Sequence, residues 1–204
     1  MLESLKKMLG VASTAEQRTI TVVSGLPRSG TSLMMQMLEA GGLPPLTDGQ
    51  RERDEDNPKG YYEFQRVKKL DEGDTAWLPQ ARGRAVKVVS ALLPHLPVNY
   101  QYQVLFMRRQ LQEVLASQEK MLGRRGEEKE IDDEEMEQLY RKHLRETREW
   151  LESRSDVRSL EVDFNELVTD PAPVVRQVVS FLDADLDADA MTSVVDPDLY
   201  RNRA

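Results

Sequence analysis

The stretch that decides the fold is Thr19-Ile-Thr-Val-Val-Ser-Gly25-Leu-Pro-Arg-Ser-Gly30-Thr-Ser32. An apolar, β-branched run leads into a glycine-rich turn, and apolar residues at helical spacing follow. This order predicts a strand, a loop and a helix, with the loop amides and the helix N-terminus facing an anion. The spacing of Gly25 and Gly30 fits the phosphate-loop template, but Thr31 stands where nucleotide hydrolases carry a lysine. Arg28 lies inside the loop instead, so the stretch predicts a phosphate cradle that is not built to hydrolyse ATP.

Composition limits the classes of function. A chain of 204 residues with 39% hydrophobic and 31% charged residues predicts one domain, residues 1–204, with a single sizeable core. The net charge of −8 argues against binding to nucleic acid or to an anionic membrane, so an anionic ligand needs a locally basic pocket. The absence of cysteine excludes disulfides and thiolate metal sites. No apolar run approaches a membrane span or a signal peptide, so we expect a cytoplasmic protein.

Strands and helices are expected to alternate along the chain. Besides the strand that begins at Thr19, apolar runs predict strands over 85–89, 102–107 and 157–164. Helical spacing predicts helices over 2–9, from the cradle to Ala40, and over 61–70, 111–122, 136–151 and 171–182. The pattern predicts an α/β fold in three layers, a central parallel sheet with helices on both faces. The polar stretch 44–60 is expected to be a loop long enough to be functional.

A second pair of polar residues follows the run over 102–107. Arg109 stands at the carboxyl end of that predicted strand, and Ser117 comes eight residues later. Ligands of open parallel sheets bind outside the carboxyl ends of the strands, so we expect Arg109 to share that edge with the glycine-rich loop. Ser117 lies about two turns into the next helix. An arginine fork with a hydroxyl nearby predicts a second phosphate site; a surface salt bridge and an incidental serine are the alternative interpretation.

Together these motifs resemble the sulfotransferase family, whose donor is 3′-phosphoadenosine 5′-phosphosulfate. The stretch 26–32 resembles the family's 5′-phosphosulfate loop, and Arg109 with Ser117 matches the Arg and Ser, eight apart, that hold the donor's 3′-phosphate. The stretch 57–63 resembles a segment common in bacterial members, and 196–202 a frequent C-terminal signature. The resemblance covers nearly the whole chain. It implies a phosphate-loop-like fold, no metal, and transfer of a sulfuryl group to a hydroxyl or amine of a small-molecule acceptor.

The resemblance also implies which residues bind the donor. They are Pro27, Arg28, Ser29, Gly30, Thr31, Ser32, Arg109 and Ser117. Thr31 and Ser32, with the loop amides, are expected to bind the 5′-phosphate. Arg28 is expected to bridge to the sulfuryl or leaving oxygens. Because arginine stays charged, its expected role is to stabilise negative charge rather than to donate a proton.

One position on the second predicted strand departs from the cytosolic branch of the family. Members of that branch place a histidine two residues after a lysine. Here Lys87 is kept, but Val89 occupies the histidine position. An unpaired lysine among apolar neighbours is costly, so Lys87 is expected to meet the sulfuryl group or a catalytic carboxylate, or to form a structural ion pair. His95, six residues beyond Val89, is a further candidate base and is more readily interpreted as a structural or surface histidine.

The general base is therefore left open. Other branches of the family use a glutamate from the segment after the cradle helix, which makes Glu63 the first candidate. Asp54, Glu55 and Asp56 are the alternatives in the same segment. Such a base would take the proton from the acceptor as it attacks.

Several aromatic and basic residues carry two interpretations each. Trp77 is expected either to line an acceptor pocket or to anchor the core, and Phe164 either to stack on adenine or to pack at a strand end. His143 is expected to be a packed helix residue. Arg201 and Arg203 are candidates to assist the 3′-phosphate.

Two other functions compete with sulfuryl transfer. One is a phosphate-loop kinase or nucleotide hydrolase, which Thr31 disfavours. The other is a non-catalytic nucleotide-binding protein on the same fold, which Val89 keeps open. The acceptor's identity and the oligomeric state are left open.

Overall fold

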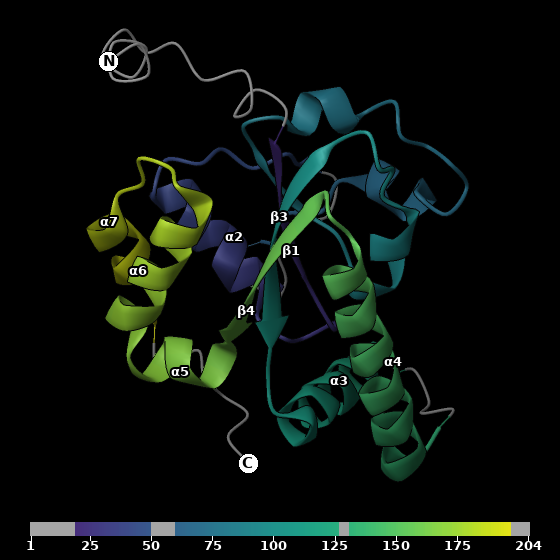
Figure 1. Ribbon diagram of the computed structural model, residues 1–204. Helices are drawn as coiled ribbons and strands as arrows, with labels where there is room; N and C mark the ends of the chain where they lie inside the picture. Colours follow the sequence, from purple (N-terminus) through teal and green to yellow (C-terminus); the bar gives the residue numbers. More distant parts are fainter. Residues whose placement is uncertain (1–18, 50–59, 127–130, 197–204) are drawn as a thin grey trace, which may run out of the picture.

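A central sheet of four parallel strands organises the computed structural model, which describes residues 19–49, 60–126 and 131–196 (Figure 1). The strands are β1 (Thr19–Gly25), β2 (Ala85–Lys87), β3 (Gln101–Arg108) and β4 (Val157–Asp163), in the order β2-β1-β3-β4. In the register, Val22 of β1 pairs with Val86 of β2 and with Val104 of β3. Strand β1 is therefore central, and the loop that follows it emerges between the ends of its two neighbours.

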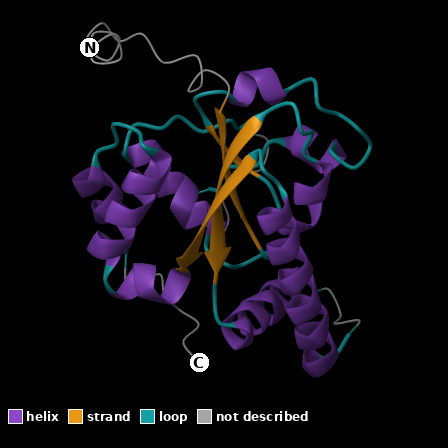
Figure 2. Ribbon diagram, in the orientation of Figure 1, coloured by secondary structure: helices purple, strands orange, loops and turns teal. Residues whose placement is uncertain are grey.

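Helices cover both faces of the sheet (Figure 2). One face is covered by α2 (Thr31–Ala40), α5 (Phe164–Thr169), α6 (Pro171–Leu182) and α7 (Ala188–Ser193). The other is covered by α4 (Asp133–Ser153) and by the 3-10 helices η2 (Gln65–Lys69), η3 (Leu78–Ala81) and η4 (Ser90–His95). Helix α3 (Leu111–Arg125) follows the carboxyl end of β3 and packs on α4. The predicted fold class, a parallel sheet between two helical layers, is confirmed.

Alternating side chains of the strands enter two separate cores. Ile20 and Val22 point into the core beneath α4 and the 3-10 helices, whereas Val23 points into the core beneath α2 and α6. Val104 and Leu105 of β3 divide in the same way. Because both faces are buried, these strands read as continuous apolar runs rather than as alternating ones.

The expected helices over 31–40, 111–122, 136–151 and 171–182 are confirmed. Several element boundaries differ from the expected ones, and three of the differences have a local cause. Strand β2 ends at Lys87 rather than at 89, because η4 begins at Ser90. The helix expected over 61–70 is only the short η2, since Tyr62 has a φ of 54°, which a right-handed helix does not allow. Strand β4 ends at Asp163, whose carboxylate accepts from the amides of Asn165 and Glu166 and so begins α5.

The helix expected over 2–9 lies outside the described residues. In the part of the chain that is described, no helix has both the length and the apolar character that a bilayer crossing requires.

Candidate active site

The loop between β1 and α2 is closed by its own hydrogen bonds. The amide and the hydroxyl of Ser29 both donate to the Leu26 carbonyl, at 3.2 and 2.7 Å. Ser29 is 1% exposed, so its hydroxyl serves the turn. Gly30 is the N-cap of α2 and no side chain caps the helix there. The N-terminus of α2, with its partial positive charge, therefore faces the space beside the loop.

Both glycines of the loop are required by close approach as well as by backbone conformation. A Cβ on Gly25 would lie 2.5 Å from Ser29 Oγ and 2.6 Å from the Met107 carbonyl oxygen. A Cβ on Gly30 would lie 2.3 Å from Cδ2 of Phe164. The φ angles, +150° and +98°, also favour glycine. The loop is thus packed against β3 on one side and α5 on the other.

A cleft of about 470 Å³ opens beside the loop, at the carboxyl end of the sheet. Among the residues that the structure describes, three cations line it, Arg28, Lys87 and Arg109, together with one carboxylate, Glu63. The cleft is therefore locally basic in a chain of net charge −8. Among the predicted site residues, those that line the cleft are Pro27, Arg28, Gly30, Thr31, Ser32, Glu63, Lys87 and Arg109. Ser29 and Ser117 do not.

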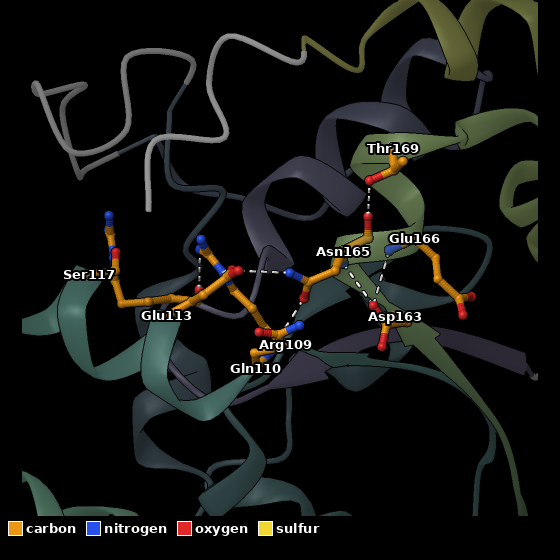
Figure 3. Close-up of polar contacts among 9 residues, drawn as sticks. Arg109, Gln110, Glu113, Ser117, Asp163, Asn165, Glu166 and Thr169 are labelled. Carbon is orange, nitrogen blue, oxygen red and sulfur yellow. Dashed lines mark hydrogen bonds and ion pairs between the residues drawn. The ribbon is translucent and has the colours of Figure 1, made fainter. Parts of the chain in front are cut away.

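The guanidinium of Arg109 lies at the loop, on the sheet edge where the sequence placed it. Its Nη1 donates to the Arg28 carbonyl at 3.2 Å, and its Nε donates to Glu113 Oε2 at 2.8 Å (Figure 3). The ring centroid of Phe164 lies 4.4 Å from its Cζ. The Arg109 side chain is only 8% exposed, yet it lines the cleft. Its guanidinium is therefore held by Glu113 along one edge and by the Phe164 ring on one face.

Arg28 and Ser117 meet each other across the cleft wall. Arg28 Nε donates to Ser117 Oγ at 2.9 Å, and Ser117 is 3% exposed. The side chain of Arg28 is thus turned toward α3, which joins the loop to that helix. A contact between these two residues was not anticipated from the sequence, which assigned them to opposite ends of a ligand.

Lys87 and Glu63 lie on the β2 side of the cleft. Lys87 Nζ donates to Ser32 Oγ and to the Tyr61 carbonyl, both at 3.0 Å. The Glu63 side chain is 17% exposed, and its Oε2 lies 3.1 Å from Nζ of the exposed Lys68. Lys87 and Glu63, which the sequence singled out separately, therefore line the same cleft. The alternative bases Asp54, Glu55 and Asp56 lie outside the described residues.

The two histidines of the chain are not part of the cleft lining. His95 is exposed at the end of η4, which agrees with its interpretation as a surface histidine. His143 Nε2 lies 2.8 Å from Ser90 Oγ, which ties α4 to η4. Burial lowers the pKa of His143 below its ordinary value, and the nearby Glu146 opposes that shift. Val89, in the position of the family's histidine, lines the cleft and is 39% exposed.

The aromatic alternatives separate clearly. Trp77 is fully buried in the core beneath α4, and its Nε1 donates to the Asp74 carbonyl at 2.9 Å. The interpretation of Trp77 as a wall of the acceptor pocket is therefore wrong. Phe164 is 7% exposed and packs in the other core, yet it also lines the cleft. Arg201 and Arg203 lie outside the described residues.

Two residues that shape the site were missed by the sequence analysis. Glu113 is 2% exposed and accepts from Arg109 Nε and, at 2.9 Å, from Asn165 Nδ2 (Figure 3). The spacing of Arg109 and Glu113, four residues on a helix start, is a signal that could have revealed the first contact. Nothing in the sequence pattern links Asn165 to them. Within 19–49, 60–126 and 131–196, no three His, Cys, Asp or Glu side chains are grouped as a metal site requires.

Comparison with known proteins decides the family. The model of the sulfotransferase domain matches residues 18–198. The chain belongs to the sulfotransferase family. Members of this family are enzymes that transfer a sulfuryl group to an acceptor molecule. Among solved structures, this sulfotransferase is similar to a sulfotransferase domain from the curacin biosynthetic pathway, with 19% identity, coverage of 84% of this chain and 76% of that one, and a TM-score of 0.49. A search among curated proteins returns no match to the chain.

Proposed function

We propose that this sulfotransferase takes its sulfuryl group from 3′-phosphoadenosine 5′-phosphosulfate and passes it to a hydroxyl or amine of a small molecule. The observation that carries the proposal is the place of Arg109, whose Nη1 lies 3.2 Å from the carbonyl oxygen of Arg28 in the loop. A helix N-terminus and an arginine fork thus share one cleft. This arrangement suits a ligand with two separate anionic ends.

The two ends of such a donor would meet different groups. Thr31 and Ser32, with the amides at the start of α2, would hold the 5′-phosphosulfate. Arg109 would hold the 3′-phosphate. Ser117 is 3% exposed and does not line the cleft, but its Oγ accepts from Arg28 Nε at 2.9 Å. Ser117 would therefore act on the donor through Arg28, by holding the positively charged guanidinium in place.

Sulfuryl transfer asks the protein for positioning and for stabilisation of charge. The acceptor oxygen or nitrogen bonds to sulfur while the bond from sulfur to the leaving phosphate oxygen breaks, and negative charge grows on that oxygen. As in phosphoryl transfer, the protein has little covalent chemistry to supply. Lys87 Nζ, 3.0 Å from Ser32 Oγ, and Arg28 are the cations that would stabilise this charge.

Glu63 would be the general base. It lines the same cleft as Lys87, on the β2 side, where the acceptor would approach. Removal of the acceptor proton as the bond to sulfur forms is the step for which a carboxylate at this place is suited.

Calorimetry with adenosine 3′,5′-bisphosphate and, separately, with ATP and Mg²⁺ tests the donor. We expect micromolar binding of the bisphosphate, independent of magnesium and lost in Arg109→Ala. Tighter binding of ATP with magnesium would contradict the proposal and favour a kinase or hydrolase.

A non-catalytic nucleotide-binding protein is the second candidate, because Val89 occupies the histidine position of the family and lines the cleft. Turnover with a panel of phenols, alcohols and amines separates the two. If no acceptor of the panel is turned over although the bisphosphate binds, the result would favour the non-catalytic binding protein.

A further inference from the structure

A buried carboxylate holds the arginine that we assign to the 3′-phosphate. Glu113 is 2% exposed, and its two oxygens have different partners: Oε2 accepts from Arg109 Nε at 2.8 Å, and Oε1 accepts from Asn165 Nδ2 at 2.9 Å. Figure 3 shows the side chains of Arg109, Glu113 and Asn165 meeting; Arg109 directly follows β3, Glu113 belongs to α3 and Asn165 to α5. Burying a carboxylate costs desolvation free energy, which is offset only when its oxygens have well-placed hydrogen-bond partners.

Three contacts together define the plane of the Arg109 fork. Its Nε edge is bound by Glu113, its Nη1 by the Arg28 carbonyl, and its face lies over the Phe164 ring. A guanidinium binds a phosphate through donors in a rigid plane, so its affinity depends on how that plane is turned. Contacts on one edge and one face leave little freedom for rotation.

Asn165 is itself held on two sides. Its backbone amide donates to Asp163 Oδ1 at 2.8 Å, within the cap of α5, and its Oδ1 lies 3.5 Å from the Gln110 amide. The Nδ2 group is therefore directed at Glu113 by the start of α5. In this way the junction of β4 and α5 supports a side chain at the end of β3.

We propose that Glu113 and Asn165 are positioning residues for recognition of the donor's 3′-phosphate. They act through Arg109, by fixing the plane in which its guanidinium meets the phosphate. This inference rests on the proposed function, since it takes Arg109 to be the 3′-phosphate residue.

The readout is a ratio of affinities, which a merely structural role would not move. Calorimetry gives the Kd of adenosine 5′-phosphate and the Kd of adenosine 3′,5′-bisphosphate. The first Kd divided by the second measures how much the 3′-phosphate contributes to affinity. In Glu113→Gln we expect this ratio to fall about tenfold, the loss of one well-aligned charged hydrogen bond. The sign is informative: removing a negative charge near a phosphate would by charge alone raise the ratio.

The hydrogen-bond pattern supplies a rescue. A carboxylate accepts from both partners, but a glutamine at 113 must present a donor to one of them. If its oxygen serves Arg109, its amide group opposes Asn165 Nδ2. In Glu113→Gln/Asn165→Asp, the aspartate accepts from the new amide and the net charge is restored, so we expect most of the ratio to return. Glu119→Gln, an exposed change of equal charge on α3, is the control and should leave the ratio unchanged.

Two further variants keep the inference falsifiable. Asn165→Ala changes no charge, and we expect it to lower the ratio severalfold with the affinity for adenosine 5′-phosphate unchanged. It carries the test if Glu113→Gln does not fold. In an Arg109→Ala background, Glu113→Gln should change the ratio no further.

The outcomes separate this inference from the proposed function. If the wild-type chain does not prefer the bisphosphate, or if Arg109→Ala keeps that preference, the proposed function fails and this inference with it. If the preference exists and depends on Arg109, yet Glu113→Gln and Asn165→Ala keep the wild-type ratio, only the positioning role is overturned. A ratio lowered in Glu113→Gln and restored in the double variant supports it.

Discussion

The two sides of the cleft are built differently. On the β3 side, two arginines are held by buried partners: Arg109 donates to Glu113, and Arg28 donates to Ser117. On the β2 side, the strand has three residues, Val89 is 39% exposed, and Glu63 is paired with an exposed lysine. The first side is preorganised, while the second is a short strand and a loop segment.

This difference matches the two ligands that we propose. A donor whose structure never changes is bound best by side chains that are already held in place. Binding then loses little side-chain entropy. An acceptor site on loops can change shape without disturbing the sheet. We therefore expect changes on the β2 side to affect turnover and changes on the β3 side to affect nucleotide binding and stability.

Glu63→Gln should have the largest effect on the β2 side. Loss of a general base is expected to lower kcat by about 10²- to 10⁴-fold, with bisphosphate affinity nearly unchanged. Steady-state kinetics with an acceptor from the panel and calorimetry measure the two. Lys68→Gln, which removes the lysine beside Glu63 but no cleft residue, is the control. Full turnover in Glu63→Gln would remove this residue as the base.

Lys87→Met should have the next largest effect. The cation beside Ser32 is expected to stabilise the leaving oxygen, so its loss should lower kcat by about 10²- to 10³-fold. Because the charge develops mainly during transfer, the Kd of the bisphosphate should change far less than kcat. Rapid kinetics and calorimetry on the same preparation give both values. An equal loss in binding and in kcat would mean that Lys87 serves ground-state binding alone.

Gly30→Ala tests the rigidity of the β3 side. The new Cβ would lie 2.3 Å from Phe164, whose ring also lies over Arg109. We expect a loss of about 2–4 kcal/mol in unfolding free energy, from strain and overpacking, together with weaker bisphosphate binding.

Gly42→Ala is a matched control for Gly30→Ala, since its φ is +99° against +98° but nothing lies within 4 Å of its Cβ. It should cost only about 1 kcal/mol from the backbone. Urea unfolding measures both variants. Equal losses would show that the loop does not depend on the contact with α5.

The smallest expected effect concerns the contact of α4 with η4, which follows β2, where His143 Nε2 lies 2.8 Å from Ser90 Oγ. Its pKa is lowered by burial, so the unfolded state binds the proton more readily. That contribution to stability is complete above about pH 6.5 and is lost as the pH falls toward the lower folded value. We expect the melting temperature to fall by about 1–2 °C more in the wild type than in His143→Gln between pH 7 and 5.5, a small value because solvent screens the partly exposed ring.

Differential scanning calorimetry measures this shift. His95→Gln, which alters the exposed histidine, should keep the wild-type pH dependence. If His143→Gln keeps the wild-type change in melting temperature between pH 7 and 5.5, the change does not arise from His143.

Much of the fold was predictable from local pattern. The runs 19–25 and 102–107 are buried on both sides, so their hydrophobicity is continuous and marks them as strands of a parallel sheet. Boundaries were less predictable. Strand β4 ends at Asp163 because its carboxylate caps α5, and the strand-like run alone extends to Phe164. Helix α5 is one turn and a half, too short for a periodic signal to stand out.

The sequence determined that a glycine-rich loop and Arg109 share one edge of a sheet, because parallel strands end together and both motifs directly follow strands. The packed structure decided what those groups touch. Arg28 meets Ser117 across 89 positions of the chain, and Asn165 meets Glu113 across 52. Trp77 is buried in a core cluster whose members range along the chain from Ile20 to Val157. A periodic pattern reports which face of one element is buried, but it holds no record of which distant element covers that face.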